Sequence, residues 1–456
     1  MINTTPEHGM SRAADYELDT LMIVASTGAA IDVKQIMVEL NLYEDLFANV
    51  TTGDLLLSDT QNLCNTLPLV GHEYLLVSFK KAGQRKAQSY TKTFRIYRMA
   101  DRRRVGLNTD AYILHFCSEE LILNDVVRIS KSYRGKTIAS IIKDIALNYL
   151  KIDAEKLSQI STTFGVYDWV IPNWKPFQTI NWLANRALGP IHKSATFLFY
   201  ETRQGFRFTD LETLVQQRPV ESFIFAPKAV NLGNNEHDKT DLELAVAGVE
   251  SYTIRDTFNT LQLLQTGGLA GSLITVDPLR QRIAMSTYTL PGQWDKTKHL
   301  NAKALSSTAP TRLGSGLTDH PQTFRRLFLT TVGHDTMTYG KGRQVHRPNE
   351  VEQWMIPRNM YLSLLQQAKI EVLVPGHPTV QVGDVVTFDL PAAALKDESM
   401  ADADHVFSGH YLVTACRHKI DHEMHACVLE LVKDSIVNAF VSPSTTNASL
   451  KKVKTL

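Results

Sequence analysis

The chain has 456 residues, 43% of them hydrophobic, which is too long for one compact core and predicts two to four domains. Its 48 Lys and Arg residues nearly cancel 47 Asp and Glu residues, so a net charge of +1 argues against a protein that coats DNA. The start lacks the basic and apolar segments of a signal peptide, and no apolar run is long enough to cross a bilayer. We therefore expect folding in a cytoplasm, a setting that also suits the four cysteines as free thiols.

After a flexible N-terminus of residues 1–15, short strands predict an antiparallel β domain over residues 16–118. Alternation is clearest where Val38, Leu40 and Leu42 are separated by polar residues. Further strands are expected at residues 21–24, 55–58, 73–79, 93–99 and 111–116. The run Asp101-Arg102-Arg103-Arg104 should interrupt the strand before it, and we interpret it as a solvated hairpin tip or an inter-subunit charge contact rather than a DNA contact.

The period becomes helical in residues 119–219, which predicts an α+β domain. Apolar residues from Ile138 to Leu150 repeat at helical spacing, and Thr137 is a suitable N-cap. Pro176 can open a second helix with an apolar face that runs to Leu188. Two short strands are predicted after it, at residues 196–200 and 205–209.

Strands return in the last part of the chain. We predict a second β domain that is split between residues 220–266 and 367–438, with a strand at Leu261–Leu264 in its first piece. Residues 267–366 form a loop-rich insertion with one late helix at about residues 359–368, and residues 439–456 are a polar tail. The closing strands are expected at residues 369–374, 385–390, 410–415 and 426–432. The predicted fold class is therefore mainly β with α+β parts.

One segment near the C-terminus has residues that could bind a metal. A two-residue turn at Asp421-His422 would place His418 opposite His425 and Cys416 opposite Cys427 in a hairpin, and two Cys with two His can bind zinc. In the alternative interpretation, both cysteines are small buried apolar residues and the histidines lie near a solvated turn. We favour this alternative, because the spacing matches no zinc finger. We expect no metal site, with these four residues as the candidates if one exists.

No motif predicts catalysis or a cofactor. Glu201, Asp210 and Glu212 could suggest a glycosidase pair, but nothing in the sequence places them around a cleft. The glycine-rich segments 267–272 and 340–343 lack the features of a phosphate-binding loop. We expect neither catalytic nor cofactor-binding residues.

Three segments in order carry a resemblance to a known family. They are Met37 to Asn62, with Glu44-Asp45-Leu46-Phe47 at its centre; Ile171-Pro172-Asn173-Trp174-Lys175-Pro176-Phe177, followed by the strands at 197–201 and 205–208; and the closing strands that begin at Gln381, Gly409 and Cys427. Together they resemble the baseplate hub proteins of contractile-tailed bacteriophages, which are related to the N-terminal part of type VI secretion spike proteins. The resemblance covers most of residues 20–435.

The resemblance implies two tube-like antiparallel β-barrel domains, at 16–118 and at 220–266 with 367–438. It implies a homotrimer in which six such domains match a six-fold tail tube, since equivalent contacts require two similar surfaces in each chain. Its partners would be the tail tube or tube-initiator protein and the central spike, with the tape measure protein and baseplate wedge as further candidates, and no sequence-specific nucleic acid. The chain would be assembled in the bacterial cytoplasm, reside in the virion baseplate and have no enzymatic activity. The alternatives are the hub of a phage-derived protein injection system and a tail-associated cell-wall hydrolase.

Overall fold

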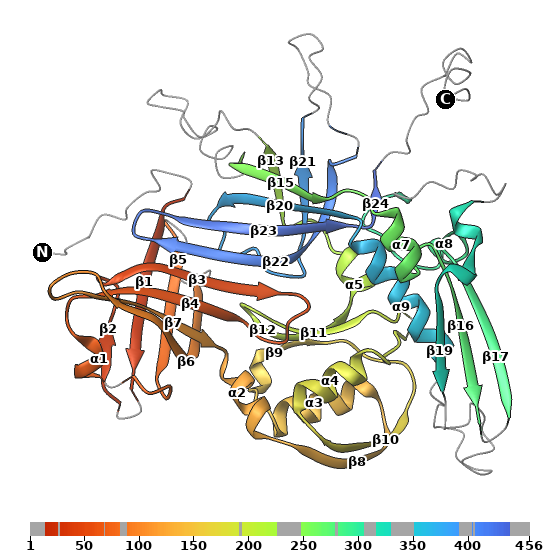
Figure 1. Cartoon of the computed structure of the whole chain (residues 1–456), viewed down its shortest axis with the longest axis horizontal. Coiled ribbons are helices and arrows are strands. Elements are labelled where there is room, and N and C mark those ends of the chain that lie inside the picture. The colour runs from red at the N-terminus through yellow and green to blue at the C-terminus, as the bar shows by residue number, and fades with distance from the viewer. Residues whose placement is uncertain are drawn as a thin grey trace, which may run out of the picture.

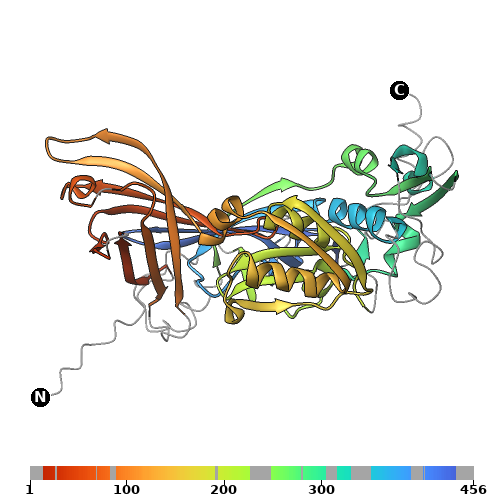
Figure 2. The same ribbon diagram turned by 90° about the horizontal axis from the view of Figure 1, so that it is seen from below.

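The computed structural model describes residues 14–25, 28–67, 69–82, 89–190, 194–225, 248–278, 281–304, 316–329, 351–391, 404 and 406–437. The predictions for residues 1–13, for the polar tail at residues 439–456 and for the segment 340–343 lie outside this part of the chain. The fold is mainly β, as predicted, and one large sheet extends through two β regions (Figure 1). Seen from below, the molecule is elongated (Figure 2).

The first β region forms one end of the molecule. Its neighbouring strands are all antiparallel, in the order β3-β4-β7-β6-β5-β1-β2. Alternating apolar residues such as Leu55, Leu57 and Leu114 are fully buried on the inner face. The elements are β1 (Tyr16–Val24), β2 (Ala30–Asp32), β3 (Met37–Asp45), β4 (Thr52–Asp59), α1 (Leu63–Thr66), β5 (Tyr74–Lys81), β6 (Tyr90–Arg104) and β7 (Asp110–Cys117).

The predicted break at Asp101–Arg104 is wrong, because β6 continues through it. Asp101 has a φ of 51°, and the pairing with β7 shifts between Ala100 and Arg103, so the strand accommodates this run with a bulge. Arg102 and Arg104 both form ion pairs with Asp110 on β7, at 2.9 and 3.3 Å. The hairpin turns only after these residues.

The α+β region lies beside the first β region, with helices α3 and α4 against its small sheets (Figure 1). Thr137 caps α3 as predicted, since its side chain accepts a hydrogen bond from the Ser140 amide at 3.2 Å. The second predicted helix opens at Pro176 but ends at Ala184, although Ala187 and Leu188 are still buried. The elements are α2 (Glu119–Val126), β8 (Ile129–Lys136), α3 (Ile138–Asn148), β9 (Leu157–Ile160), β10 (Tyr167–Trp174), α4 (Pro176–Ala184), β11 (Phe197–Thr202), β12 (Gly205–Asp210) and α5 (Leu211–Val215).

The second β region is built from both pieces of the predicted split domain. Strands β21, β22, β23 and β20 pair in succession, and β22 also pairs with β3 of the first region. The elements are β13 (Glu221–Phe225), β14 (Gly248–Val249), β15 (Ser251–Asp256), β20 (Ala368–Pro375), β21 (Val385–Asp389), β22 (Gly409–Asp421), β23 (His425–Lys433) and β24 (Ser435–Ile436).

Each β region curls until its ends approach one another. In the first, the His425 amide of β23 donates to the Ala14 carbonyl, next to β1, at 3.1 Å. In the second, β14 pairs with β13, and two residues later β15 begins to pair with β20. The described strands nevertheless form no continuous closed barrel, because the long strand β22 passes from one region into the other. The structure therefore confirms a mainly β fold, and not closed barrels.

Residues 267–366 are less loop-rich than predicted. They contain α9, which begins eight residues before the predicted helix, and a three-stranded sheet in the order β17-β16-β19 that projects at the far end of the molecule (Figures 1 and 2). The elements, with the helix before them, are α7 (Thr260–Thr266), β16 (Ala270–Asp277), β17 (Arg282–Thr289), α8 (Leu290–Trp294), β18 (Lys303–Ala304), β19 (Arg325–Leu329) and α9 (Val351–Leu365).

The predicted strand at Leu261–Leu264 is instead part of helix α7. The Asn259 side chain accepts a hydrogen bond from the Gln262 amide at 3.0 Å, and Gly267 ends the helix with a φ of 79°. The capping residues at both ends favour a helix, whereas the short apolar run Leu261–Leu264 is compatible with either a helix or a strand. Of the described helices, none is both long and apolar enough to cross a membrane.

Candidate functional site

The hairpin β22–β23 joins the two β regions, and the cysteines and histidines of the sequence prediction lie on it. Cys416 belongs to the core of the second region, whereas Ile420, four residues later, belongs to the core of the first. His418 lies between them and is 1% exposed. The predicted group is thus placed inside the protein, at the junction of its two β regions.

The hairpin register differs from the prediction. The Asp421 amide bonds to the Met424 carbonyl, so the turn is His422-Glu423, one residue later than expected. His418 consequently lies opposite Cys427, and Ile420 lies opposite His425. Relative to the predicted pairing, the register of the two strands is shifted by two residues. Because side chains alternate between the two faces of a strand, a shift by an even number leaves each side chain on its predicted face. The four candidate residues therefore still come together.

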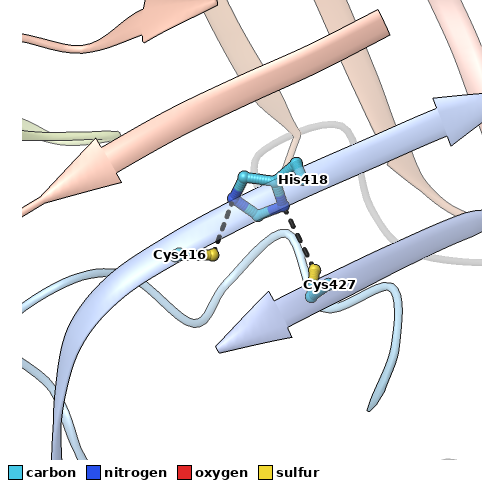
Figure 3. A group of neighbouring side chains, drawn as sticks. All are labelled: Cys416, His418 and Cys427. Atoms are coloured by element: carbon cyan, nitrogen blue, oxygen red, sulfur yellow. Dashed lines mark hydrogen bonds between the residues drawn. The ribbon is translucent and has the colours of Figure 1, made fainter. Parts of the chain in front are cut away.

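The polar atoms of this group are in contact. Nδ1 of His418 lies 3.1 Å from Nε2 of His425 and 3.2 Å from Sγ of Cys427. The Cys427 sulfur is also 3.5 Å from Nε2 of His425. Sγ of Cys416 lies 3.5 Å from Nε2 of His418, so the imidazole stands between the two sulfurs (Figure 3). We name Cys416, His418, His425 and Cys427 the Cys/His cluster.

Aromatic rings and a glycine enclose the cluster. Phe79 contacts both imidazoles edge-on, with ring centroids 5.9 Å from His418 and 5.1 Å from His425, and Tyr90 lies 5.6 Å from His418. A Cβ on Gly376 would lie 2.1 Å from Nδ1 of His425, so only glycine leaves room for that ring. The His377 amide donates to Sγ of Cys427 at 3.3 Å. The cluster is therefore tightly held and has no open face for a substrate.

Burial and mutual contacts shift the ionisation of the cluster. Burial opposes ionisation of the Cys427 thiol, but Cys416 and the two imidazoles lower its pKa well below the usual range. Burial acts to lower the pKa of His418, yet the Cys427 sulfur raises it on balance. Burial lowers the pKa of His425. Of the two thiols in the cluster, Cys427 therefore ionises more readily to the thiolate, which is the form that binds metal.

A buried carboxylate accompanies the cluster. Glu44 on β3 pairs directly with Cys416 on β22, so both side chains lie on the same face of the sheet. Glu44 is 2% exposed, and neither of its carboxylate oxygens has a hydrogen-bond partner among the described residues. Burial raises its pKa, while His418 and Lys92 act in the opposite direction. The sequence analysis missed this residue, although Glu44 is in phase with Leu40 and Leu42 and the alternation therefore places it on the buried face.

The three carboxylates considered for a glycosidase do not form one site. Glu201 forms an ion pair with Lys92 at 2.9 Å. It also accepts hydrogen bonds from the Thr51 amide and the Ser118 hydroxyl. Asp210 caps α5 through Thr213. Glu212 accepts a hydrogen bond from the Lys298 amide at 3.3 Å, and burial raises its pKa to about 7. Asp210 and Glu212 share a small cavity, but Asp210 is committed to its cap.

A second feature escaped the sequence analysis. The outer face of the sheet β17-β16-β19 has two rows of apolar residues, Met285-Ile274-Leu327 and Ile283-Val276-Leu329, as the strand registers place them. Ile283 is 74% exposed and Leu327 is 68% exposed. Residues 283–285 (Ile-Ala-Met) and 327–329 (Leu-Phe-Leu) are short apolar runs that signal strands, whereas the sequence analysis predicts a loop-rich insertion here. We name these six residues the outer apolar face.

Comparisons with known proteins agree with the resemblance in the sequence. The chain is 24% identical over 424 residues to the probable baseplate hub protein gp334 of Vibrio phage KVP40, which covers 91% of this chain and 94% of that protein. No protein-family model matches the sequence.

Two solved structures share the fold over nearly the whole chain. A tail protein from Neisseria meningitidis superposes with a TM-score of 0.54 at 12% identity, covering 92% of this chain and 97% of that one. The 43 kDa tail protein of prophage MuSo2 from Shewanella oneidensis gives a TM-score of 0.50 at 12% identity, covering 91% and 99%. In sequence, this chain is similar to a probable baseplate hub protein of a phage, and in fold it is similar to two tail proteins.

Proposed function

We propose that the chain is the baseplate hub of a contractile phage tail. It would be a trimer with pseudo-six-fold symmetry that joins the hexameric tail tube to the trimeric central spike and forms part of the channel for genome ejection. The observation that carries the proposal is the similarity to a probable baseplate hub protein over 91% of the chain. The proposed role is structural. The burial of the Cys/His cluster, which leaves it no open face for a substrate, supports a structural rather than a catalytic role.

The arrangement of the two β regions supports the tube contact. The proposed tube-like domains are residues 16–118 and residues 220–266 with 367–438, with 119–219 and 267–366 as the parts that face other components. Each of the two regions curls toward closure, and both use the hairpin β22–β23. A shared hairpin fixes their relative orientation. The proposal requires the two regions to present similar surfaces, because three chains need two such surfaces each to meet a six-fold ring.

The outer apolar face supports association of three copies of this chain. The opposite face of the same sheet already packs on α9 through Leu273, Trp354 and Ile356. Burying one of the outer side chains is worth about 1.5–3 kcal/mol, so a face of six can contribute substantially to an interface. A second copy is the occupant that fits, because the sheet projects from the end of the molecule, where a neighbouring chain can reach it (Figure 2). We propose that this face packs between copies in the trimer.

Substitution on the face tests the interface. Ile283→Asp with Leu327→Asp should shift the trimer to monomers in light scattering, because each Asp would be buried without a partner. Leu107→Asp, at a residue that is 95% exposed on another hairpin, is the matched control and should leave the mass unchanged. A double variant that stays trimeric would reject this face as the contact, although the hub assignment would stand.

A further inference from the structure

We propose that the Cys/His cluster is a structural zinc site that fastens the two β regions together. Its ligands are Sγ of Cys427, Nδ1 of His418 and Nε2 of His425, with Cys416 as the fourth. The inference is independent of the hub function, since a hub could work with or without a metal at this junction.

The distances between the donor atoms match a metal site. Bonds of about 2.0–2.1 Å to nitrogen and 2.3 Å to sulfur in a tetrahedron place neighbouring donors about 3.3–3.8 Å apart. The three atoms of Cys427, His418 and His425 are separated by 3.1, 3.2 and 3.5 Å. They form one face of such a tetrahedron with shifts of only a few tenths of an ångström.

Cys416 is the nearest further donor. Its sulfur lies within 4.8 Å of the Cys427 sulfur. Cys416 now contacts Nε2 of His418, on the other side of the ring from Nδ1, so it must turn toward the metal to complete the set (Figure 3). Two Cys and two His are a common ligand set of structural zinc sites, which are closed to solvent as this cluster is.

The surroundings of the cluster suit a bound cation. Two thiolates balance the charge of Zn²⁺, so a zinc ion bound here would leave no net charge in the buried cluster. The His377 amide donates to the Cys427 sulfur, as second-shell groups do for metal-bound thiolates. Without a cation, four polar side chains would be buried among the aromatic rings of Phe79 and Tyr90 at a cost that only their mutual contacts offset.

Metal analysis of the full chain tests the proposal. Protein produced with added zinc and purified without chelators should hold about one zinc per chain, and a strong chelator should lower its melting temperature. Cobalt(II) exchanged into the site should give the charge-transfer absorption of thiolate ligands. Folded wild-type protein that holds less than about a tenth of an equivalent of zinc and shows no such absorption would overturn the proposal.

Variants locate the metal within the chain. Cys427→Ser and His425→Gln should each lose the zinc and the cobalt absorption. Cys117→Ser is the matched control, because Cys117 is equally buried in β7 but belongs to no metal-binding group among the described residues, and it should keep both. If Cys427→Ser does not fold, the wild-type stoichiometry still decides. Zinc retained by a folded Cys427→Ser, His425→Gln double variant would place the metal elsewhere and contradict the assignment.

Discussion

Cys416 and Ile420 lie on one strand, β22, but pack into different hydrophobic cores. The strand thus begins in the second β region and ends in the first, where it pairs with β3. His418 lies between the two residues and contacts His425 and Cys427 on the facing strand. Because neither core can lose this hairpin, we expect the two β regions to behave as one structural unit.

Truncating Ile420 tests this coupling. Ile420→Ala should lower the free energy of unfolding by about 2–5 kcal/mol, as deletion of a fully buried branched side chain does. Denaturant unfolding followed by circular dichroism, which reports on the strands of both β regions, should still give one transition. Val38→Ala, at a residue that is 40% exposed, should change stability by less than about 0.5 kcal/mol. Two separate transitions in the Ile420 variant would show that the regions are independent.

Glu212 should make stability depend on pH. Burial raises its pKa from the ordinary 4.5 to about 7, so the folded state holds the proton over this range while the unfolded state releases it. The contribution of Glu212 to stability is therefore complete below pH 4.5 and is lost as the pH rises to 7. Glu212→Gln keeps an acceptor for the Lys298 amide and removes the charge, so it should stabilise the protein at pH 8 by about 1–3 kcal/mol and have little effect at pH 4.5.

Thermal unfolding of this variant and the wild type at both pH values is the measurement. Glu155→Gln, at an exposed residue of a short 3-10 helix, serves as the control and should change the melting temperature little. A Glu212→Gln variant that is destabilised more at pH 8 than at pH 4.5 would mean that the carboxylate has a favourable partner in its charged form, and would contradict the prediction.

Glu201 should be essential for the contact between the first β region and the α+β region. It is bound by Lys92 on β6, by the Thr51 amide and by the Ser118 hydroxyl. Glu201→Gln leaves the Lys92 charge largely buried and unpaired, so we expect a loss of about 3–5 kcal/mol in denaturant unfolding. Glu17→Gln removes the partner of Lys80 in a more exposed pair and should cost at most about 1 kcal/mol. Equal effects of the two substitutions would contradict the structural role assigned to Glu201.

The same carboxylate assignments predict that the protein does not hydrolyse peptidoglycan. Glu201 and Asp210 are engaged in structural contacts, so no two of the three carboxylates Glu201, Asp210 and Glu212 are free to act as a pair around one cleft. A peptidoglycan suspension should keep its turbidity in the presence of the purified protein. Clearing that disappears in an Asp210→Asn or Glu212→Gln variant would establish a hydrolase.

The sequence predicted those elements whose signals are local. The Thr137 cap, the Pro176 helix start and the closing strands were found, because caps and alternation are formed by neighbouring residues. The apolar run Leu261–Leu264 predicts a strand but belongs to helix α7, because a four-residue apolar run fits both structures and the capping residues Asn259 and Gly267 favour the helix.

The candidate site was predictable in composition but not in environment. Alternation alone placed Cys416, His418, His425 and Cys427 on one face, and this holds for either hairpin register. Their burial could not be predicted, because it depends on Phe79 and Tyr90, more than 300 residues away in the sequence. The hydrogen bond between His425 and Ala14 is equally non-local.

The mass and symmetry of the purified protein test the central claim most directly. Light scattering, with and without the spike protein, combined with electron microscopy should give particles of three 51.2-kDa chains that present six similar β lobes around a channel. We expect three-fold symmetry over the whole particle and near six-fold symmetry at the end that meets the tail tube. The hub proposal would be contradicted by a protein that stays monomeric at every concentration, even with the spike protein present. A trimer whose two β regions do not alternate around one ring would contradict it as well.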